Sequence, residues 1–189
     1  MPWTSKAFIF ILVVSASAGI DLITQTSITA FMELPSPKET HLDAFLASGT
    51  MDGFFNTSEI FGIFNFLAAT YPDHIARKSI GRTKGGEDIW AFTVSTSLKS
   101  SIRKSEVLFT ALHHAREVLS GNMMVKMGLQ LIHKCRHGGP HSDFLKYLNV
   151  LMIPIVNVDG HRFISNSYGG ANWATAKLKR KNTNSDYCP

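Results

Sequence analysis

Residues 106–117 read EVLFTALHHARE, and an apolar run passes there directly into polar and charged side chains. Three consecutive large apolar residues, at positions 107–109, predict a buried strand over residues 106–112. The following residues, from 118 to about 133, repeat apolar side chains at helical spacing. The pattern therefore predicts a strand, a short loop and a helix, with histidine and glutamate side chains at the carboxyl end of the strand.

The same two kinds of segment recur along the chain. Asn56 and Glu59 have the spacing of a capping box and predict the start of a helix. Residues 89–96 alternate apolar and polar side chains, which predicts a strand with one covered face. Residues 149–156 are strongly apolar and predict a central strand, whereas the chain from Asn157 onward is predicted to be a polar loop. Strands separated by helices indicate an α/β fold, in which helices cover the faces of a sheet.

The first 18 residues have the pattern of a signal peptide. Residues 7–14 are all apolar, and residues 16–18 read Ala-Ser-Ala, which is a small-x-small cleavage pattern. The apolar run is far shorter than the roughly 20 residues that a membrane span needs. We therefore expect a secreted, extracellular protein with no stable membrane span. Residues 19–55 are expected to be a leader or short pro-segment without a core of its own, and residues 56–189 a folded domain.

The composition is that of an ordinary globular protein. Of the 189 residues, 44% are hydrophobic and 17% are charged, and the net charge is +5. The densest basic cluster consists of Lys177, Lys179, Arg180 and Lys181, with no aromatic residue between them. Because sites for single-stranded nucleic acids combine basic side chains with stacking aromatics, we expect no nucleic-acid partner. A solvated surface, or a site that faces an anion, fits the cluster better.

The His-x-x-Glu spacing of His114 and Glu117 suits a metal ion. Imidazole and carboxylate groups both bind zinc at about 2 Å, and a strand end would hold the two side chains rigidly. The spacing is short, so a helix-starting acid beside a surface histidine explains it as well. His113 competes with His114 as the ligand. We prefer His114 because it has the required spacing and because its neighbour would point the other way on a continuing strand.

Three segments resemble the zinc metallocarboxypeptidases of the carboxypeptidase A/B type. Residues 114–117 are similar to the His-Ala-Arg-Glu zinc motif of that family. Residues 154–160 are similar to its Pro-x-x-Asn-Pro-Asp-Gly signature, with Val158 in the usual proline position. Residues 178–182 are similar to its Leu-Trp-Arg-Lys-Asn/Thr segment, with lysine replacing the tryptophan. The resemblance covers roughly residues 54–189 and implies a phosphorylase/hydrolase-like α/β/α fold, truncated at the C-terminus.

The resemblance implies a role for several residues. His114 and Glu117 would be two ligands of a catalytic Zn²⁺, and Arg180 would stabilise the oxyanion formed during hydrolysis. Arg116 would contact the peptide at the rim of the site, although a structural salt bridge is an alternative for it. The Asn-x-Asp segment at 157–159 would shape a turn rather than take part in chemistry. The substrates would be the C-termini of peptides or proteins.

Departures from the family pattern limit these expectations. Gly85-Gly86-Glu87 lacks the arginine of the family's Glu-Gly-Arg loop, and the sequence ends at Pro189. The family's third zinc-binding histidine, carboxylate-gripping Asn-Arg pair, pocket tyrosine and general-base glutamate have no counterpart here. We therefore expect an N-terminal part of a catalytic domain with little or no activity alone. The alternatives are a secreted non-catalytic isoform or pseudoenzyme, and a zinc amidohydrolase or deacylase that shares His-x-x-Glu.

The cysteines and one histidine cluster leave further alternatives. Cys135 and Cys188 could pair with each other, whereas the resemblance implies a partner for Cys188 beyond the end of the chain. His133, Cys135, His137 and His141 lie within nine residues. Because their spacing matches no compact zinc module, we do not assign a second metal site to them.

Overall fold

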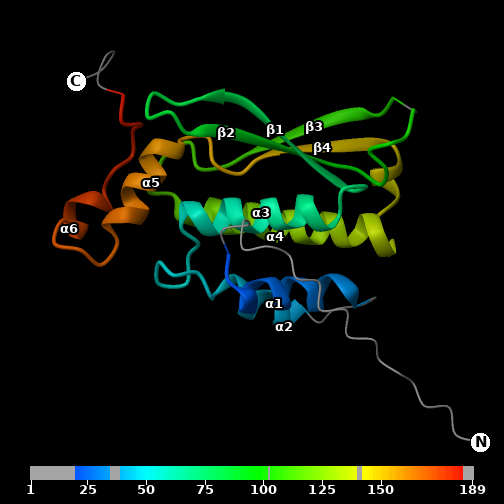
Figure 1. Cartoon of the computed structure of the whole chain (residues 1–189), viewed down its shortest axis with the longest axis horizontal. Helices are drawn as coiled ribbons and strands as arrows, with labels where there is room; N and C mark the ends of the chain where they lie inside the picture. The colour runs from blue at the N-terminus through cyan, green and yellow to red at the C-terminus, as the bar shows by residue number, and fades with distance from the viewer. Residues whose placement is uncertain (1–19, 35–38, 102, 140–141, 185–189) are drawn as a thin grey trace, which may run out of the picture.

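The computed structural model describes residues 20–34, 39–101, 103–139 and 142–184. The signal-peptide prediction, His141 and Cys188 lie outside these residues. Three helices are followed by three strands, a long helix, the fourth strand and two further helices along the described chain (Figure 1). Their order is α1 (Leu22–Glu33), α2 (Glu39–Leu46), α3 (Thr57–Thr70), β1 (Ile75–Arg82), β2 (Asp88–Val94), β3 (Ser105–Thr110), α4 (Val118–His137), the 3-10 helix η2 (Asp143–Lys146), β4 (Leu148–Ile153), α5 (Val158–Ser167) and α6 (Trp173–Ala176).

The four strands form one mixed sheet in the order β1-β2-β4-β3. β1 and β4 each pair antiparallel with β2, whereas β3 runs parallel to β4. Phe92, Met152 and Phe109 are partners across neighbouring strands, so they lie on the same face of the sheet. The strand over 148–153 is internal, which confirms the central strand predicted from its apolar run.

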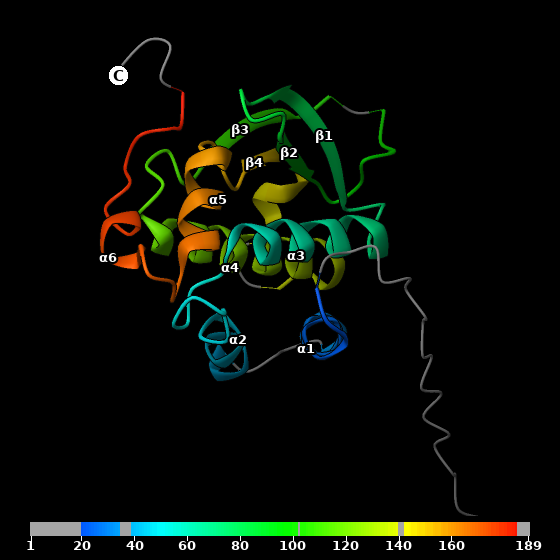
Figure 2. The same ribbon diagram turned by 60° about the vertical axis from the view of Figure 1, so that its left-hand side comes forward.

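Two helical layers lie on one side of this sheet. α3 and α4 pack directly against the strands, and α1 and α2 form a further layer beyond them (Figures 1 and 2). The rings of Phe64 in α3 and Phe92 in β2 lie 4.8 Å apart, centroid to centroid. The buried apolar side chains of all these elements form one core. Helices α1 to α4 therefore cover one face of the sheet, whereas α5 and α6 lie beyond the ends of the strands (Figures 1 and 2).

β3 differs from the buried strand predicted for residues 106–112. All six of its residues are exposed, including Val107 at 37%, Leu108 at 58% and Phe109 at 42%. The prediction of burial was wrong because β3 is an edge strand in the described sheet and pairs with β4 alone. Apolar composition reports how well a strand can be buried, and it does not report whether a neighbour is present on each side.

α3 begins as the sequence predicts. The side chain of Asn56 accepts a hydrogen bond from the Glu59 backbone N–H at 2.9 Å, and the Glu59 carboxylate accepts one from the Asn56 N–H at 2.7 Å. These two bonds form the predicted capping box. The helix then buries a broad apolar face in the core, which includes Ile60, Ile63 and Phe64.

The segment before α3 folds onto α4. Ile28 of α1 and Leu42 of α2 are buried in the common core rather than in a separate one. Near the end of α1, the Nε2 atom of His133 lies 2.6 Å from the Leu34 carbonyl oxygen, and that of His137 lies 2.8 Å from the Met32 carbonyl oxygen. These histidines of α4 therefore satisfy backbone acceptors at the end of a helix, which is a structural role.

Cys135 forms no disulfide with any residue that the structure describes, and burial raises the pKa of its thiol to about 12. A thiol with so high a pKa stays protonated at neutral pH and is a poor nucleophile and a poor metal ligand.

The chain after Asn157 contradicts the prediction of a loop. Residues 158–167 form α5, and a short helix, α6, follows it. Val158, His161 and Ile164 are buried at a spacing of three residues. Because the middle member of this buried stripe is a histidine, the sequence shows no apolar periodicity there. Asp159 and its neighbouring glycine therefore lie in the first turn of a helix rather than in a connecting turn.

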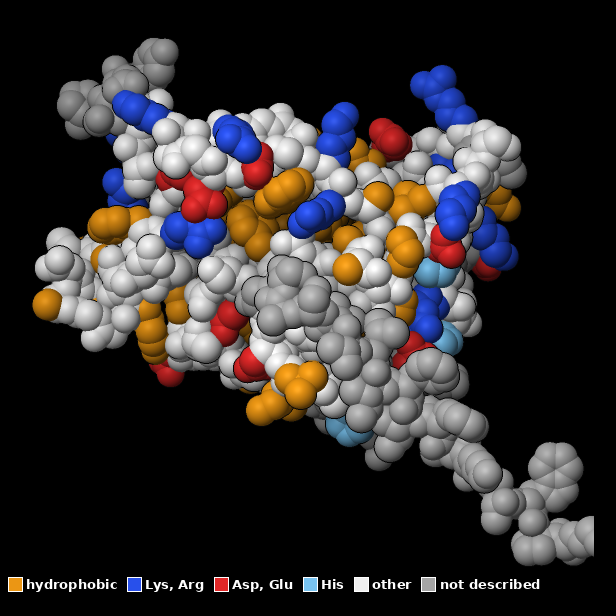
Figure 3. All heavy atoms as spheres, viewed as in Figure 1, with side chains coloured by type: hydrophobic (Ala, Val, Ile, Leu, Met, Phe, Trp, Pro, Cys, Tyr) orange, Lys and Arg blue, Asp and Glu red, His pale blue; other side chains and the backbone are white. Residues whose placement is uncertain are grey.

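Charge is distributed without a large single-sign region on the face shown in Figure 3. Basic side chains are spread over that face, and acidic side chains lie among them. In the described part of the chain, no helix has the length and apolar character needed to cross a bilayer.

Candidate active site

The predicted metal-binding motif lies in the loop between β3 and α4, at the carboxyl ends of two adjacent strands. Beyond the ends of β3 and β4, hydrogen bonds still connect the backbones of the two segments. Val156 N–H donates to the Ala111 carbonyl at 3.0 Å, and Asn157 N–H donates to the Leu112 carbonyl at 2.9 Å. Leu112 has a φ of +52°, an uncommon value for a residue with a side chain. The loop therefore leaves the strand by a sharp turn, and the neighbouring segment at 156–157 holds it in place.

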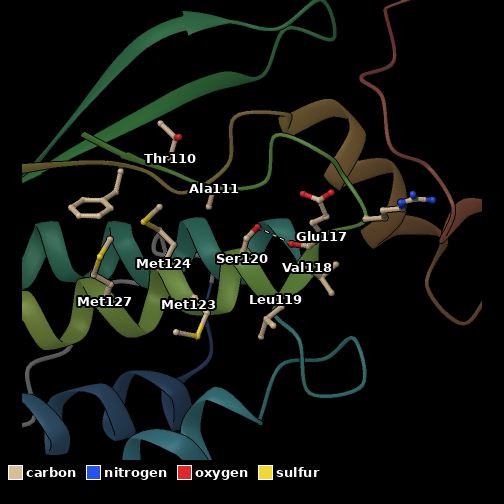
Figure 4. A pocket seen from close by; sticks show the side chains of 11 residues that line it. Thr110, Ala111, Glu117, Val118, Leu119, Ser120, Met123, Met124 and Met127 are labelled. Carbon is tan, nitrogen blue, oxygen red and sulfur yellow. Dashed lines mark hydrogen bonds between the residues drawn. The ribbon is translucent and has the colours of Figure 1, made fainter. Parts of the chain in front are cut away.

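His114 and Glu117 converge in this loop. The Nδ1 atom of His114 lies 2.7 Å from the Oε1 atom of Glu117. The side chains are 37% and 54% exposed, so solvent and solutes reach both of them. Glu117 stands at the N-terminal end of α4, at one end of a groove (Figure 4). An imidazole nitrogen and a carboxylate oxygen thus form a hydrogen bond at the surface, and both are groups that bind zinc.

His113 takes another direction. Its Nε2 atom lies 3.3 Å from the hydroxyl of Thr110, and no contact with Glu117 occurs. The side chain that contacts Glu117 is therefore that of His114 and not that of His113.

The segment that carries Arg180 packs against the same loop. The Arg180 carbonyl accepts hydrogen bonds from Ala115 N–H at 3.0 Å and from the Asn157 side-chain amide at 3.3 Å. The Arg180 residue is exposed. Arg116, also exposed, donates to the Leu178 carbonyl at 3.5 Å rather than to a carboxylate. The fold thus places the four predicted site residues on two adjoining segments.

The described residues provide an incomplete ligand set for a catalytic zinc ion. No group of three His, Cys, Asp or Glu side chains in the described ranges is arranged to hold a metal ion. A catalytic zinc site normally has three protein ligands and an open position for water or substrate. His114 and Glu117 have the chemistry of two such ligands and lie next to each other.

The Asn-x-Asp segment has contacts that the local sequence does not predict. Asn157 reaches both the His113 carbonyl and the Arg180 carbonyl at 3.3 Å. Asp159 accepts hydrogen bonds from the hydroxyl of Thr83 at 2.7 Å and from Gly85 N–H at 3.0 Å. The only sequence signal for these contacts is the Asn-x-Asp-Gly pattern itself, because each partner lies more than 20 residues away in the chain.

A wide groove of about 770 Å³ extends from the site along β3 and α4. Figure 4 shows Met124 and Met127 on the side of α4 that faces the strands. Ser120 and Glu117 lie at the N-terminal end of this helix, at one end of the groove. Its walls are mainly apolar and include the exposed Phe109 of the edge strand. The polar pair therefore lies at one end of an open apolar surface.

The chain is similar to several known proteins. A family model described as zinc carboxypeptidase matches residues 62–188. An "Inactive metallocarboxypeptidase ecm14" of Talaromyces marneffei is 26% identical over 170 residues, which are 84% of this chain and 27% of that protein. A "Zinc carboxypeptidase" of Saccharothrix mutabilis subsp. capreolus is 30% identical over 112 residues, which are 57% of this chain and 25% of that protein.

Among solved structures, carboxypeptidase A from Helicoverpa armigera superposes with a TM-score of 0.57 at 20% identity. The superposition covers 88% of this chain and 36% of that one. At this identity the likeness shows the fold alone, and it confirms the predicted α/β, carboxypeptidase-like fold. The chain spans about a third or less of the length of these proteins.

Proposed function

The chain belongs to the zinc carboxypeptidase family, and we propose that His114 and Glu117 hold two of the three protein positions around a catalytic Zn²⁺. The observation that carries this proposal is the 2.7 Å separation of His114 Nδ1 and Glu117 Oε1. Both atoms bind zinc readily, and both are accessible at a strand end. The proposed reaction of the complete domain is hydrolysis at the C-termini of peptides.

Each remaining site residue has a task that follows from its chemistry. When bound, Zn²⁺ polarises a carbonyl group and lowers the pKa of a coordinated water. The guanidinium of Arg180 carries a permanent positive charge and several N–H donors, which suits a negative oxygen that develops on the substrate. Arg116, exposed beside the pair, contacts the peptide chain at the rim. The groove along α4 is apolar and does not supply these polar functions.

With two ligands in the part of the chain that the structure describes, we expect metal binding to be weak. We therefore propose that this chain alone binds Zn²⁺ with low affinity and hydrolyses peptides slowly or not at all. The test is a calorimetric titration of the metal-free full-length chain with Zn²⁺. His114→Ala and Glu117→Gln should each abolish the weak site, and His113→Ala should leave it unchanged. Equal Zn²⁺ binding by wild type and His114→Ala would refute the assignment.

The histidines of α4 require a second control. His133 and His137 bind backbone carbonyls in the folded protein, but an unfolded population would expose them to metal. A folded state verified by circular dichroism at each titration point removes this ambiguity. Chelator-sensitive release of C-terminal residues at a rate typical of an enzyme would contradict the proposed low activity.

A non-catalytic role is the second candidate. Two fungal relatives, from Talaromyces marneffei and Saccharomyces cerevisiae, carry the name inactive metallocarboxypeptidase. A peptide with a free C-terminal carboxylate would then bind beside Arg116 and Arg180 without being cleaved. Binding of such a peptide, lost in Arg180→Ala and absent for the amidated peptide, would support this role. Family membership argues against a deacylase, and assays with acyl-amino-acids provide the corresponding check.

We also propose that the protein is exported and acts outside the cell, as the signal-peptide pattern predicts. Expression of the full chain in a secreting host, followed by N-terminal sequencing of the protein in the medium, tests this proposal. A first residue at or near Gly19 is expected. Retention of the intact chain inside the cell would contradict it.

A further inference from the structure

The side-chain amide of Asn157 forms hydrogen bonds with three segments: the loop before α4, the segment of Arg180 and the start of α5. Its Nδ2 group donates to the His113 carbonyl and to the Arg180 carbonyl, each at 3.3 Å. Its Oδ1 atom accepts from Gly160 N–H at 3.1 Å and thereby caps α5. The residue is only 8% exposed, so water replaces these bonds poorly if they are lost.

A backbone hydrogen bond also joins the loop before α4 to the segment of Arg180. Ala115, which lies between the two proposed zinc ligands, donates its N–H to the Arg180 carbonyl at 3.0 Å. That carbonyl therefore accepts from Ala115 and from Asn157 together. Since Ala115 is fully buried, the position of the Arg180 backbone and the path of the ligand loop depend on each other.

The helix start leaves room for the Asn157 amide. A Cβ atom added to Gly160 would lie 2.6 Å from Asn157 Oδ1 and 2.8 Å from its Nδ2. A side chain at position 160 would therefore displace the amide from its contacts. This close approach gives a physical reason for glycine three residues after the asparagine.

We propose that Asn157 is a positioning residue that fixes the His114–Glu117 loop and the Arg180 segment in one mutual geometry. The inference rests on the proposed function, because it matters for catalysis only if these segments form the site. An amide is required, since it alone donates to two carbonyls while it accepts from Gly160 N–H. The residue acts through its neighbours and touches no reacting atom.

Two substitutions separate positioning from helix capping. Asp is as good a helix N-cap as Asn, so Asn157→Asp keeps the acceptor for Gly160 N–H and replaces the group that donates to the two carbonyls with a negatively charged oxygen. Asn157→Ala removes both functions. Asp159→Asn is the matched control, because Asp159 lies in the same helical turn but contacts Thr83, Gly85 and Thr183 instead of the ligand loop.

The first measurement uses NMR to record amide hydrogen exchange at Ala115 in the metal-free full chain. Asn157→Asp should raise the Ala115 exchange rate about tenfold or more relative to other core amides. Asp159→Asn should leave that ratio unchanged. The second measurement is Zn²⁺ affinity, for which loss of a group that orients a ligand typically costs 10- to 100-fold. We expect about tenfold weaker binding in Asn157→Asp and no change in the control.

The outcomes distinguish this inference from the proposed function. If Ala115 exchange and metal affinity are both unchanged in Asn157→Asp, Asn157 is only a helix cap and the inference is overturned. If the wild-type chain binds no Zn²⁺ but Ala115 exchange rises in Asn157→Asp, the positioning role of Asn157 is supported and the proposed metal site fails. A rise in Ala115 exchange of the same size in Asp159→Asn would also overturn the inference.

Discussion

At the scale of single residues, His161 shows how burial controls protonation. Its side chain is fully buried, and its Nδ1 atom lies 2.8 Å from the hydroxyl of Thr57. Burial, with a smaller contribution from the charge of Arg162, lowers the pKa of His161 to about 4. A histidine in the unfolded chain has a pKa of about 6.5. The unfolded state therefore binds this proton more readily than the folded state does.

Acid should destabilise the protein through His161. Its contribution to stability is complete above about pH 6.5 and is lost progressively as the pH falls towards about 4. The pKa difference corresponds to about 3 kcal/mol in the free energy of unfolding. Denaturant unfolding at a series of pH values between neutral and acid should show this loss. In His161→Gln the loss should be much smaller, and an equally steep pH dependence in that variant would contradict the assignment.

The two kinds of site contact differ in how far they can be predicted. His114 and Glu117 are three residues apart at a predicted strand end, so local spacing already places them near each other. The contacts of Asn157 reach residues 44 and 23 positions away in the chain. No local pattern contains that information, because the approach of the two segments results from the pairing of β3 with β4 and from the path of the chain after α5.

At the scale of elements, the start of α3 can be tested directly. Asn56 accepts from Glu59 N–H at 2.9 Å, and its own amide donates to the hydroxyl of Thr50 at 2.9 Å. Asn56→Ala removes both bonds and should lower the free energy of unfolding by about 1 kcal/mol. Asn56→Asp keeps the cap and should lose much less. Urea denaturation checks both values, and equal losses in the two variants would show that the cap itself contributes little.

Predictable elements are those whose burial follows a simple period. α3 and α4 have apolar side chains at helical spacing, and β4 is a short apolar run, so sequence alone locates all three. The sequence does not predict α5, because a histidine occupies the middle of its buried stripe. It does not predict the exposure of β3 either, because that exposure depends on which elements flank the strand and not on the strand's own residues.

At the scale of the whole molecule, one long edge of the sheet is apolar and open. β3 exposes Val107, Leu108 and Phe109, and the groove of about 770 Å³ lies beside it. A strand with unpaired backbone groups and apolar side chains is a template for pairing with another chain. Exposed apolar patches of this kind also favour association in water. We therefore expect the chain to self-associate as its concentration rises.

Leu108→Lys should reduce that association. Leu108 lies in the middle of β3 and is 58% exposed, so a lysine there adds charge to the edge without an apolar contact in the core being lost. Ile23→Lys makes the same charge change at an exposed position of α1 and is the control for net charge. Size-exclusion chromatography with light scattering should show a larger monomer fraction for Leu108→Lys than for Ile23→Lys. Because only the edge explanation depends on position, equal effects of the two substitutions would attribute association to net charge and reject the role of β3.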